Sequence, residues 1–394
     1  MSTEMTDFSE LHSARFARSF WAEKIGTKIY MYAWEYNAIY IYDEVAKKSY
    51  IRKGNPDYDG CIHCLYESSV VYKDCIYFIP GTSNSSDILK YNFKSQKIEY
   101  LKINTRQTSY SAVIIREMLY LLPIYYGERI IRINLECDEI SYMKNDYGRF
   151  DKRSKLEGTP LFYGVVKKDC TIWRACLFAP FIQKFYYEEQ RIDYIKVNGI
   201  DEGFVSLAYD GQYFWLLLLK GKRLIKWDAE ENRIIQRFNF EKAETDEYVY
   251  THLFYHKGHI WIIPRKGCVL ETIDTASGER ESINCEVVKE FRTDSAEAQS
   301  FAEGYLICDD YIYFIPFQSN GIVKIHAESR KLFFISTQID QKELVDMIVA
   351  HNSYNESMCS VGNFIEFSCS GNKKQTVLNE KHGHTIWNHI IDEV

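Results

Sequence analysis

The stretch DCIYFIPG at residues 74–81 decides how the rest of this chain is interpreted, because variants of it recur. The other copies read MLYLLP at 118–123, GHIWIIP at 258–264 and DYIYFIPF at 310–317. About a dozen residues after each copy comes a second apolar phrase that ends in Asp, Asn or His, followed by a charged turn. Related units start about 47 residues apart on average, which is within the roughly 40–50 residues of one propeller blade. The period therefore indicates a repeat architecture.

Each unit is predicted to contain four strands joined by tight turns. A short first strand leads through a two-residue turn into the aromatic second strand, and a polar turn joins the third strand to the fourth. Proline cannot donate to a strand ladder, so we expect it where the second strand ends. The prolines at that place are Pro80, Pro123, Pro264 and Pro316. The first turns are Lys73-Asp74, Asp210-Gly211, Lys257-Gly258 and Asp309-Asp310, and the polar turns begin at Asp43, Asn92, Asn134, Asp228 and Asp274.

One such sheet cannot bury both of its apolar faces, whereas seven sheets arranged radially can. The sequence therefore predicts an all-β fold, a β-propeller of seven four-stranded blades, over residues 18–338. Residues 1–17 form an N-terminal segment, and 339–394 form a C-terminal extension, either helical or an eighth blade. A row of β-sandwich domains is the rival, but no Gly/Ser-rich or Pro-rich linker divides the chain.

In its period, its four strands per unit and its aromatic strands, the region from about residue 18 to 336 resembles kelch-like and WD-like β-propeller repeat proteins. The resemblance is one of fold, because the family marks are missing. No Gly-Gly pair follows the second strand as in kelch repeats, and Trp227-Asp228 is an isolated Trp-Asp pair without the spacing of WD repeats. It implies a propeller architecture and no particular activity.

Composition limits the classes of partner. The 394 residues carry a net charge of −7, which gives no general electrostatic reason to bind nucleic acid or an anionic membrane. The N-terminal residues lack the features of a secretory signal, and no apolar run approaches the ~20 residues of a membrane span. The 11 cysteines are irregularly spaced, so we expect reduced thiols and a cytoplasmic location.

In a propeller, the loops that follow the second strands share one face with the starts of the innermost strands, here called the top face. Exposed tyrosine, tryptophan and arginine are common anchors of binding surfaces, and amide groups beside aromatic rings also suit sugars. We therefore predict that the top face binds a protein or a polar, possibly carbohydrate, ligand without catalysis. The candidate ligand-binding residues are Trp34, Tyr36, Tyr125, Tyr126, Arg265, Gln318 and Asn320.

Catalytic and metal motifs are weak. Cys61, His63 and Cys64 form a CxxC motif with an intervening histidine, but a structural zinc site needs four ligands and no second motif lies nearby. His252, His256 and His259 are too far apart on one hairpin to bind a single metal. We expect no metal and no cofactor, since nucleotide and metal fingerprints are absent from the sequence.

The alternative function is a hydrolase, lyase or modifying enzyme with a site at the mouth of the central channel. His252 and Glu303 both fall on predicted innermost strands, where their side chains face the channel, and a His–Glu pair there is suited to acid/base chemistry. A deep polar pocket with convergent histidine and carboxylate groups would favour the enzyme. A shallow aromatic face would favour the binding protein.

Overall fold

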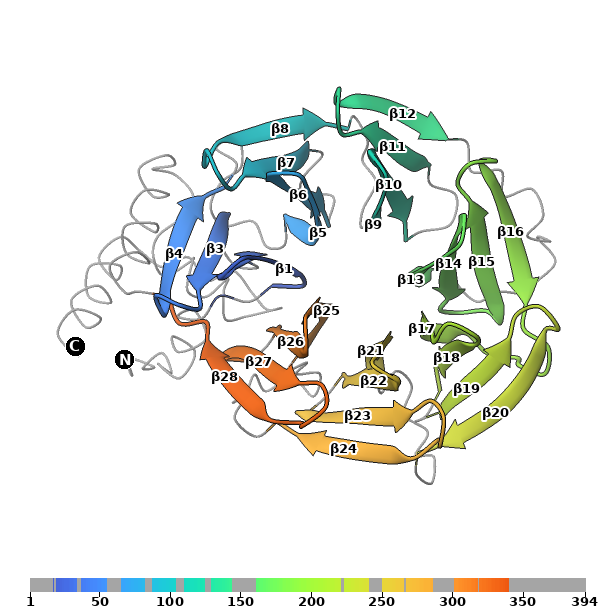
Figure 1. The fold of residues 1–394 in the computed structure, drawn as a ribbon. Coiled ribbons are helices and arrows are strands. Elements are labelled where there is room, and N and C mark those ends of the chain that lie inside the picture. Colours follow the sequence, from blue (N-terminus) through green and yellow to red (C-terminus); the bar gives the residue numbers. More distant parts are fainter. Residues whose placement is uncertain are drawn as a thin grey trace, which may run out of the picture.

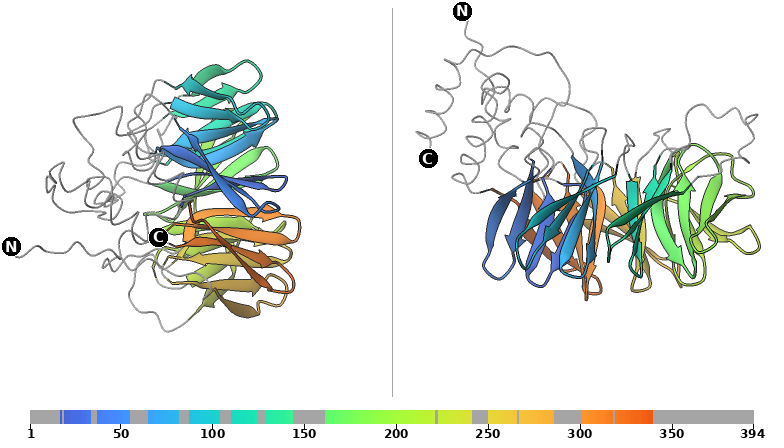
Figure 2. Two further views of the ribbon diagram at one scale, coloured as in Figure 1. Left: turned by 90° about the vertical axis from the view of Figure 1, so that its left-hand side faces the viewer. Right: turned by 90° about the horizontal axis from the view of Figure 1, so that it is seen from above.

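The computed structural model describes Ala17 and residues 19–33, 37–54, 65–81, 87–103, 110–124, 129–143, 161–220, 223–240, 250–265, 267–285, 301–317 and 319–339. These residues form seven separate antiparallel sheets of four strands each. Figure 1 shows the sheets as a ring around a central opening, and Figure 2 shows the ring from its side. The prediction of seven four-stranded blades is confirmed.

Every blade uses four consecutive strands of the chain, with the first strand innermost (Figure 1). Blade 1 consists of β1 (Ala22–Ile25), β2 (Lys28–Tyr32), β3 (Ala38–Asp43) and β4 (Lys48–Lys53), and blade 2 of β5 (Tyr66–Tyr72), β6 (Cys75–Pro80), β7 (Asp87–Asn92) and β8 (Ile98–Lys102). Blade 3 consists of β9 (Tyr110–Ile115), β10 (Met118–Pro123), β11 (Ile130–Asn134) and β12 (Glu139–Met143). Blade 4 consists of β13 (Phe162–Lys168), β14 (Thr171–Cys176), β15 (Phe181–Tyr186) and β16 (Arg191–Lys196).

Blades 5 to 7 repeat the same order. Blade 5 consists of β17 (Phe204–Tyr209), β18 (Phe214–Leu218), β19 (Arg223–Asp228) and β20 (Arg233–Asn239). Blade 6 consists of β21 (Tyr250–His256), β22 (His259–Pro264), β23 (Val269–Asp274) and β24 (Arg280–Asn284). Blade 7 consists of β25 (Phe301–Cys308), β26 (Tyr311–Pro316), β27 (Gly321–His326) and β28 (Leu332–Ser336).

The turn chemistry follows the sequence prediction. Lys73, Lys257 and Asp309 have φ near +50°, as the tight first turns require. In the turns between third and fourth strands, Asp43 Oδ1 accepts the amides of Val45 and Ala46 at 3.0 and 3.1 Å. In the corresponding turns, backbone amides donate hydrogen bonds in the same way to the side-chain oxygens of Asn92, Asn134, Asp228 and Asp274. The four prolines each end a second strand.

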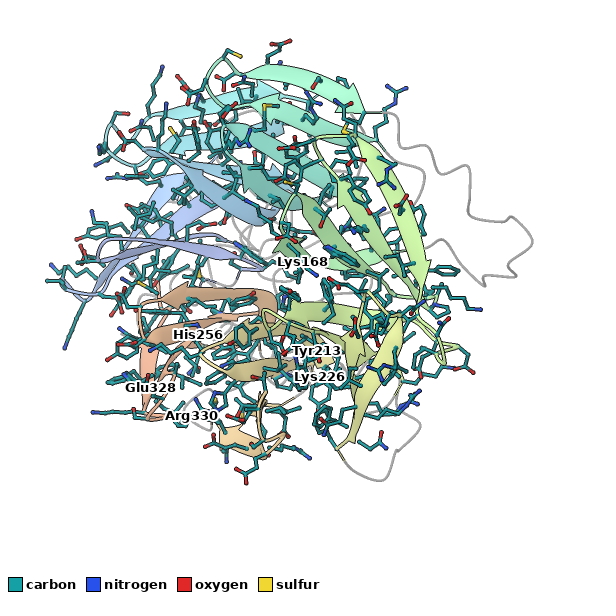
Figure 3. The ribbon with its side chains drawn as sticks, turned by 45° about the vertical axis from the view of Figure 1, so that its right-hand side comes forward. Lys168, Tyr213, Lys226, His256, Glu328 and Arg330 are labelled. Atoms are coloured by element: carbon teal, nitrogen blue, oxygen red, sulfur yellow. The ribbon has the colours of Figure 1, made fainter. Side chains whose placement is uncertain are left out.

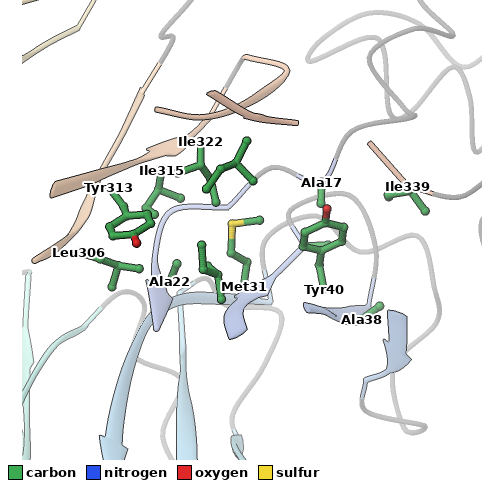
Figure 4. Packing of buried hydrophobic residues seen from close by; sticks show 13 residues of the cluster. Ala17, Ala22, Met31, Ala38, Tyr40, Leu306, Tyr313, Ile315, Ile322 and Ile339 are labelled. Carbon is green, nitrogen blue, oxygen red and sulfur yellow. The ribbon is translucent and has the colours of Figure 1, made fainter. Parts of the chain in front are cut away.

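The hydrophobic core consists of separate clusters between neighbouring blades rather than one cluster at the centre of the domain. The second and third strands of each blade supply buried side chains to the clusters on both sides. The cluster between blades 7 and 1, shown in Figure 4, includes Ala22, Met31 and Tyr40 from blade 1 and Tyr313 and Ile322 from blade 7. Ala17 and Ile339 are buried in the same cluster, beside the predicted domain boundaries.

Cationic side chains on the third strands join neighbouring blades. Lys324 Nζ on β27 lies 3.0 Å from Glu44 Oε1 in the β3–β4 turn of blade 1, and 5.0 Å from the ring centre of Tyr313 on its own blade. Lys90 makes the same pair of contacts, with Asp138 of blade 3 at 3.1 Å and with the ring of Tyr77 at 5.7 Å.

Blade 5 repeats the arrangement with a backbone acceptor. Lys226, labelled in Figure 3 beside Tyr213, lies 5.0 Å from the ring centre of Trp215. Its Nζ donates to the carbonyl oxygen of Thr275 in blade 6 at 3.1 Å. A cation between an aromatic ring and the next blade is therefore a recurring inter-blade contact.

The C-terminal extension, predicted as helical or as an eighth blade, lies outside the described residues from 340 onward. The part of the chain that the structure describes contains no helix long and apolar enough to cross a membrane.

We predict that Lys324→Met lowers the free energy of unfolding by about 2 kcal/mol, because the partly buried carboxylate of Glu44 loses one of its two cations. The control is Lys97→Met. Lys97 pairs with Glu99 at 2.6 Å but is 69% exposed, so its loss should cost less than about 0.5 kcal/mol. Chemical denaturation measures both changes. Equal losses in the two variants would contradict a specific role for the inter-blade pair.

Candidate functional site

A cavity of about 460 Å³ lies in the central channel. Its walls come from the innermost strands of five blades, from the segment that precedes β1, and from the residue after β10. Because the starts of these strands share a face with the ends of the second strands, the cavity lies toward the top face. The lining residues are Phe20, Trp21, Glu67, Ser68, Ser111, Ala112, Ile124, Tyr163, Gly164, Val165, His252 and Tyr305.

Irregular strand pairing shapes these walls. In β21, Tyr250 pairs with Pro264 and His252 pairs with Ile263, so Thr251 is an extra residue and the strand bulges. Bulges re-aim side chains and are common beside functional sites. The innermost strands of four other blades also shift register near their first residues. The shifts lie between Tyr66 and Ser68 in blade 2, Tyr163 and Val166 in blade 4, Phe204 and Ser206 in blade 5, and Phe301 and Tyr305 in blade 7. The bulges therefore lie beside the lining residues Ser68 and His252, whereas Ser111 lies on the regular strand β9.

His252 is held in the wall by its neighbours on two other blades. Its Nδ1 lies 3.1 Å from Ser206 Oγ on β17, and its ring centre lies 5.6 Å from that of Tyr305 on β25. Burial lowers the pKa of His252 to about 4, because the imidazolium form loses its hydration. The imidazole is therefore neutral at neutral pH.

Aromatic rings surround the histidine. Tyr305 stacks on Phe254 with ring centres 3.8 Å apart and planes 12° apart, and Trp21 lies 6.4 Å from Tyr305. Trp21 passes close over Gly304, whose amide donates to the carbonyl oxygen of Phe20 at 3.1 Å. A Cβ at this position would lie 2.9 Å from Trp21 Cε3, so the absence of a side chain lets the tryptophan reach the cavity.

Glu23 on β1 adds a second neutral group near the cavity. Its Oε1 accepts a hydrogen bond from Ser69 Oγ at 3.0 Å, next to the lining residue Ser68. Burial raises the pKa of Glu23 to about 8, although the hydrogen bond from Ser69 acts in the opposite direction. At neutral pH this carboxyl group is mostly protonated, so it contributes a hydroxyl donor rather than a negative charge.

Arg174 fixes the wall formed by blades 3 and 4. It occupies the place in its second strand that Phe78 takes in blade 2, yet its side chain is only 1% exposed. Its guanidinium donates to the carbonyl oxygens of Pro123 at 2.8 Å and Phe162 at 2.7 Å. These carbonyls directly precede the lining residues Ile124 and Tyr163, so Arg174 sets the position of this wall.

Three of the predicted site residues lie in the described part of the chain with their side chains. His252 lines the cavity, and a catalytic role for it stays a prediction. Arg265 and Asn320 follow β22 and the end of β26 on the top face, but neither belongs to the cavity lining. Glu303 lies within β25, and its side chain is outside the described residues. The remaining candidates also lie outside them, namely Trp34, Tyr36, Tyr125, Tyr126, Gln318, Cys61, His63 and Cys64.

Within the described ranges, no three histidine, cysteine, aspartate or glutamate side chains gather as metal ligands would. His256 and His259 illustrate this, because they flank the turn at the far end of the β21–β22 hairpin from His252. His259 Nδ1 instead contacts the carbonyl oxygen of Lys257 at 2.9 Å.

Several functional candidates were missed in the sequence. Trp21 directly precedes β1, and Glu23 lies within it. Ser206 and Tyr305 lie inside strands whose sequences look like ordinary hydrophobic core. One signal was available. The innermost strands of blades 2 to 7 all begin with an aromatic residue, and the lining residues follow within a few positions.

Comparison with known proteins supports the fold and gives no sequence family. No family model and no curated protein matches the chain. Among solved structures, virginiamycin B lyase from Staphylococcus aureus is similar with a TM-score of 0.55 and 13% identity, covering 77% of this chain and 92% of that one. A catalytically inactive variant of that lyase with quinupristin gives 0.58 and 12%, covering 82% and 97%. A computationally designed protein, Ika8, gives 0.51 and 8%, covering 81% and 86%. At these identities the similarity concerns the fold alone.

We predict a pH-dependent gain in stability for Glu23→Gln. A carboxyl whose pKa is raised by folding stabilises the folded state least at high pH, so the native protein loses stability as pH rises from about 4.5 to about 8. Glutamine removes this loss. Allowing for partial exposure, we expect a gain of about 2 kcal/mol at pH 9 and little change at pH 4.5.

Thermal or chemical denaturation across this pH range measures the effect. Glu99→Gln is the control of opposite sign, because the hydrogen bond from Lys97 lowers the pKa of Glu99. A gain for Glu23→Gln that is the same at both pH values would contradict the assignment of a neutral carboxyl.

We predict that Arg174→Leu costs about 3 kcal/mol of unfolding free energy, although leucine matches the apolar residue of the other blades. The substitution leaves the buried carbonyls of Pro123 and Phe162 without their charged donor. Phe78→Leu at the equivalent place in blade 2 is the matched control, and it should cost about 1 kcal/mol. Denaturation measures both variants, and a neutral or stabilising Arg174→Leu would show that the guanidinium does not hold this wall.

Proposed function

We propose that the protein binds a small, neutral, polar ligand with ring faces, such as a carbohydrate, in the channel cavity. The observation that carries this proposal is the composition of the cavity wall. The lining combines the aromatic residues Trp21, Tyr163 and Tyr305 with the hydroxyl-bearing residues Ser68 and Ser111. Sugars present apolar ring faces that stack on aromatic side chains and hydroxyls that exchange hydrogen bonds with polar ones.

The two groups with shifted pKa values support a neutral ligand, while the carboxyl group of Glu67 also belongs to the lining. His252 is uncharged at neutral pH, and the carboxyl of Glu23 is mostly protonated because its pKa is about 8. An uncharged ligand therefore keeps the hydrogen bonds of the site without requiring a buried counter-charge. A protein partner on the top face, the other form of the predicted binding function, stays a prediction.

The size of the cavity also fits this class of ligand. A volume of about 460 Å³ falls within the ~300–1,000 Å³ of pockets that enclose small molecules. The walls come from separate blades that are joined by inter-blade contacts, so the pocket is formed before the ligand arrives. Pre-formed walls lower the entropic cost of binding.

A cytoplasmic location is part of the proposal. The cysteines among the described residues are all free thiols, which is expected in a reducing compartment. They are Cys75, Cys137, Cys170, Cys176, Cys268, Cys285 and Cys308.

A second candidate function, an enzyme that uses acid/base chemistry at the channel mouth, has one specific observation in its favour. The imidazole of His252 is neutral and reaches the cavity, so it is able to exchange a proton with a bound molecule. Virginiamycin B lyase shares the fold, but at 12–13% identity its activity does not transfer to this chain. Turnover of a bound ligand that disappears in His252→Gln would favour the enzyme.

Calorimetric titration of the full chain with a panel of neutral mono- and disaccharides tests the proposed function. We expect saturable binding of at least one member, and a loss of about tenfold in affinity for Trp21→Ala, which removes one stacking surface. Phe333→Ala is the control, because Phe333 is an exposed aromatic residue on the outermost strand β28.

Thermal melts of both variants separate lost binding from lost folding. No binding by any panel member would contradict the proposal, and so would an affinity that Trp21→Ala leaves unchanged.

A further inference from the structure

The buried hydroxyl of Ser206 shares a hydrogen bond with Nδ1 of His252, and the direction of this bond depends on which ring nitrogen carries the proton. Ser206 is 0% exposed, so its hydroxyl group must find partners within the protein. The amide of Leu253 lies 3.5 Å from Ser206 Oγ and is able only to donate, so the serine oxygen is the acceptor in that contact. The serine hydrogen then needs an acceptor of its own.

Among the described residues, the acceptor within reach of that hydrogen is His252 Nδ1, 3.1 Å from Ser206 Oγ. A nitrogen that accepts a hydrogen bond uses its lone pair and carries no proton. Because the ring is neutral, its single proton then belongs on Nε2. The bulge at Thr251 and the contact with Tyr305 hold the ring in this orientation.

His252 lines the cavity and keeps part of its surface open. Among the described residues, the hydrogen-bond partner of His252 is Ser206, which contacts Nδ1, and none of them bonds to Nε2. A neutral donor that lacks a protein partner and borders a pocket is suited to recognise an acceptor on a ligand.

We propose that His252 Nε2–H is the specificity-determining donor of the cavity, and that it selects ligands with a neutral acceptor oxygen, a carbonyl or hydroxyl, next to a ring face. This inference rests on the proposed ligand-binding function and names its ligand class more closely. A protonated amine presents only donors, so it would oppose the N–H of His252. The contact with His252 therefore disfavours cationic ligands that otherwise have the same ring, whereas the carboxyl group of Glu67 in the same lining acts in the opposite direction.

The proton position is measured first, on the full chain without ligand. Long-range proton–nitrogen correlation spectra of protein labelled with ¹⁵N-histidine report which ring nitrogen is protonated, and His252→Gln assigns the signals. We expect one tautomer at pH 7, with the proton on Nε2. Ser206→Ala should shift His252 toward a mixture of tautomers, while Ser111→Ala, which removes another cavity hydroxyl, should leave its signals unchanged.

A proton on Nδ1 in the native protein would overturn the inference. The lone pair of Nε2 would then face the cavity, which is the arrangement that a general base needs. A tautomer ratio unaffected by Ser206→Ala would overturn it as well, because the serine would not be the determinant.

Ligand selection is measured next with two probes that share one ring. Methyl N-acetylglucosaminide carries a neutral carbonyl acceptor, and methyl glucosaminide carries an ammonium group at the same carbon. We expect the neutral probe to bind about tenfold more tightly, and His252→Leu to remove most of that preference. His252→Gln, which keeps an N–H donor, should retain part of it.

Equal affinities, or a preference for the amine, would contradict the proposed role of His252. If neither probe nor any other neutral sugar binds, the proposed function fails, while the tautomer measurement still decides the position of the proton.

Discussion

The ring depends on a cation that lies between two blades, over an aromatic ring of one and against the turn of the next. In blade 7, Lys324 lies over Tyr313 and binds Glu44 of blade 1. Apolar packing between blades is strong but non-directional, so it does not by itself fix how far one blade is rotated against its neighbour. A charged contact with defined partners on both blades fixes this rotation. The walls of the channel cavity keep their relative positions because the blades do.

Blade 6 shows that the contact is kept even when its residues change place. Thr272 stands where the other blades carry Lys90 or Lys324. The cation is instead Arg330 from the turn of blade 7, which lies 4.8 Å from the ring centre of Trp261 and 2.8 Å from Glu281 (Figure 3). Arg330 occupies the turn position that Asp138 occupies in blade 3, with φ near +57° in both. In blade 7 the turn position carries the cation, the carboxylate is Glu281 on β24 of blade 6, and the aromatic–cation–carboxylate contact remains.

The sequence predicted the blades well because their signals are local. The aromatic strand, its terminal proline and the polar turn residues all act within one unit, and Pro80 and Asp43 behave as such residues should. The cavity was much harder to predict. His252 was identified as a residue of the channel, but its partners Ser206 and Tyr305 lie 46 and 53 positions away and look like core residues. The bulges that turn them inward arise from the packing of neighbouring innermost strands, which no pattern within one unit records.

Each sheet consists of four consecutive strands, and this order allows the sheets to fold independently of one another. No strand is shared between the first and last blades, so every sheet is able to form from contacts within a segment of about 35 residues. The ring then closes through backbone hydrogen bonds of Ala17 with Thr337, Ser19 with Pro316 and Phe20 with Gly304. Side-chain contacts between blades 7 and 1 add to this closure. Closure is therefore a single long-range event that follows many short-range ones. We therefore expect the ring to open first at the junction between blades 7 and 1 when it is pulled apart.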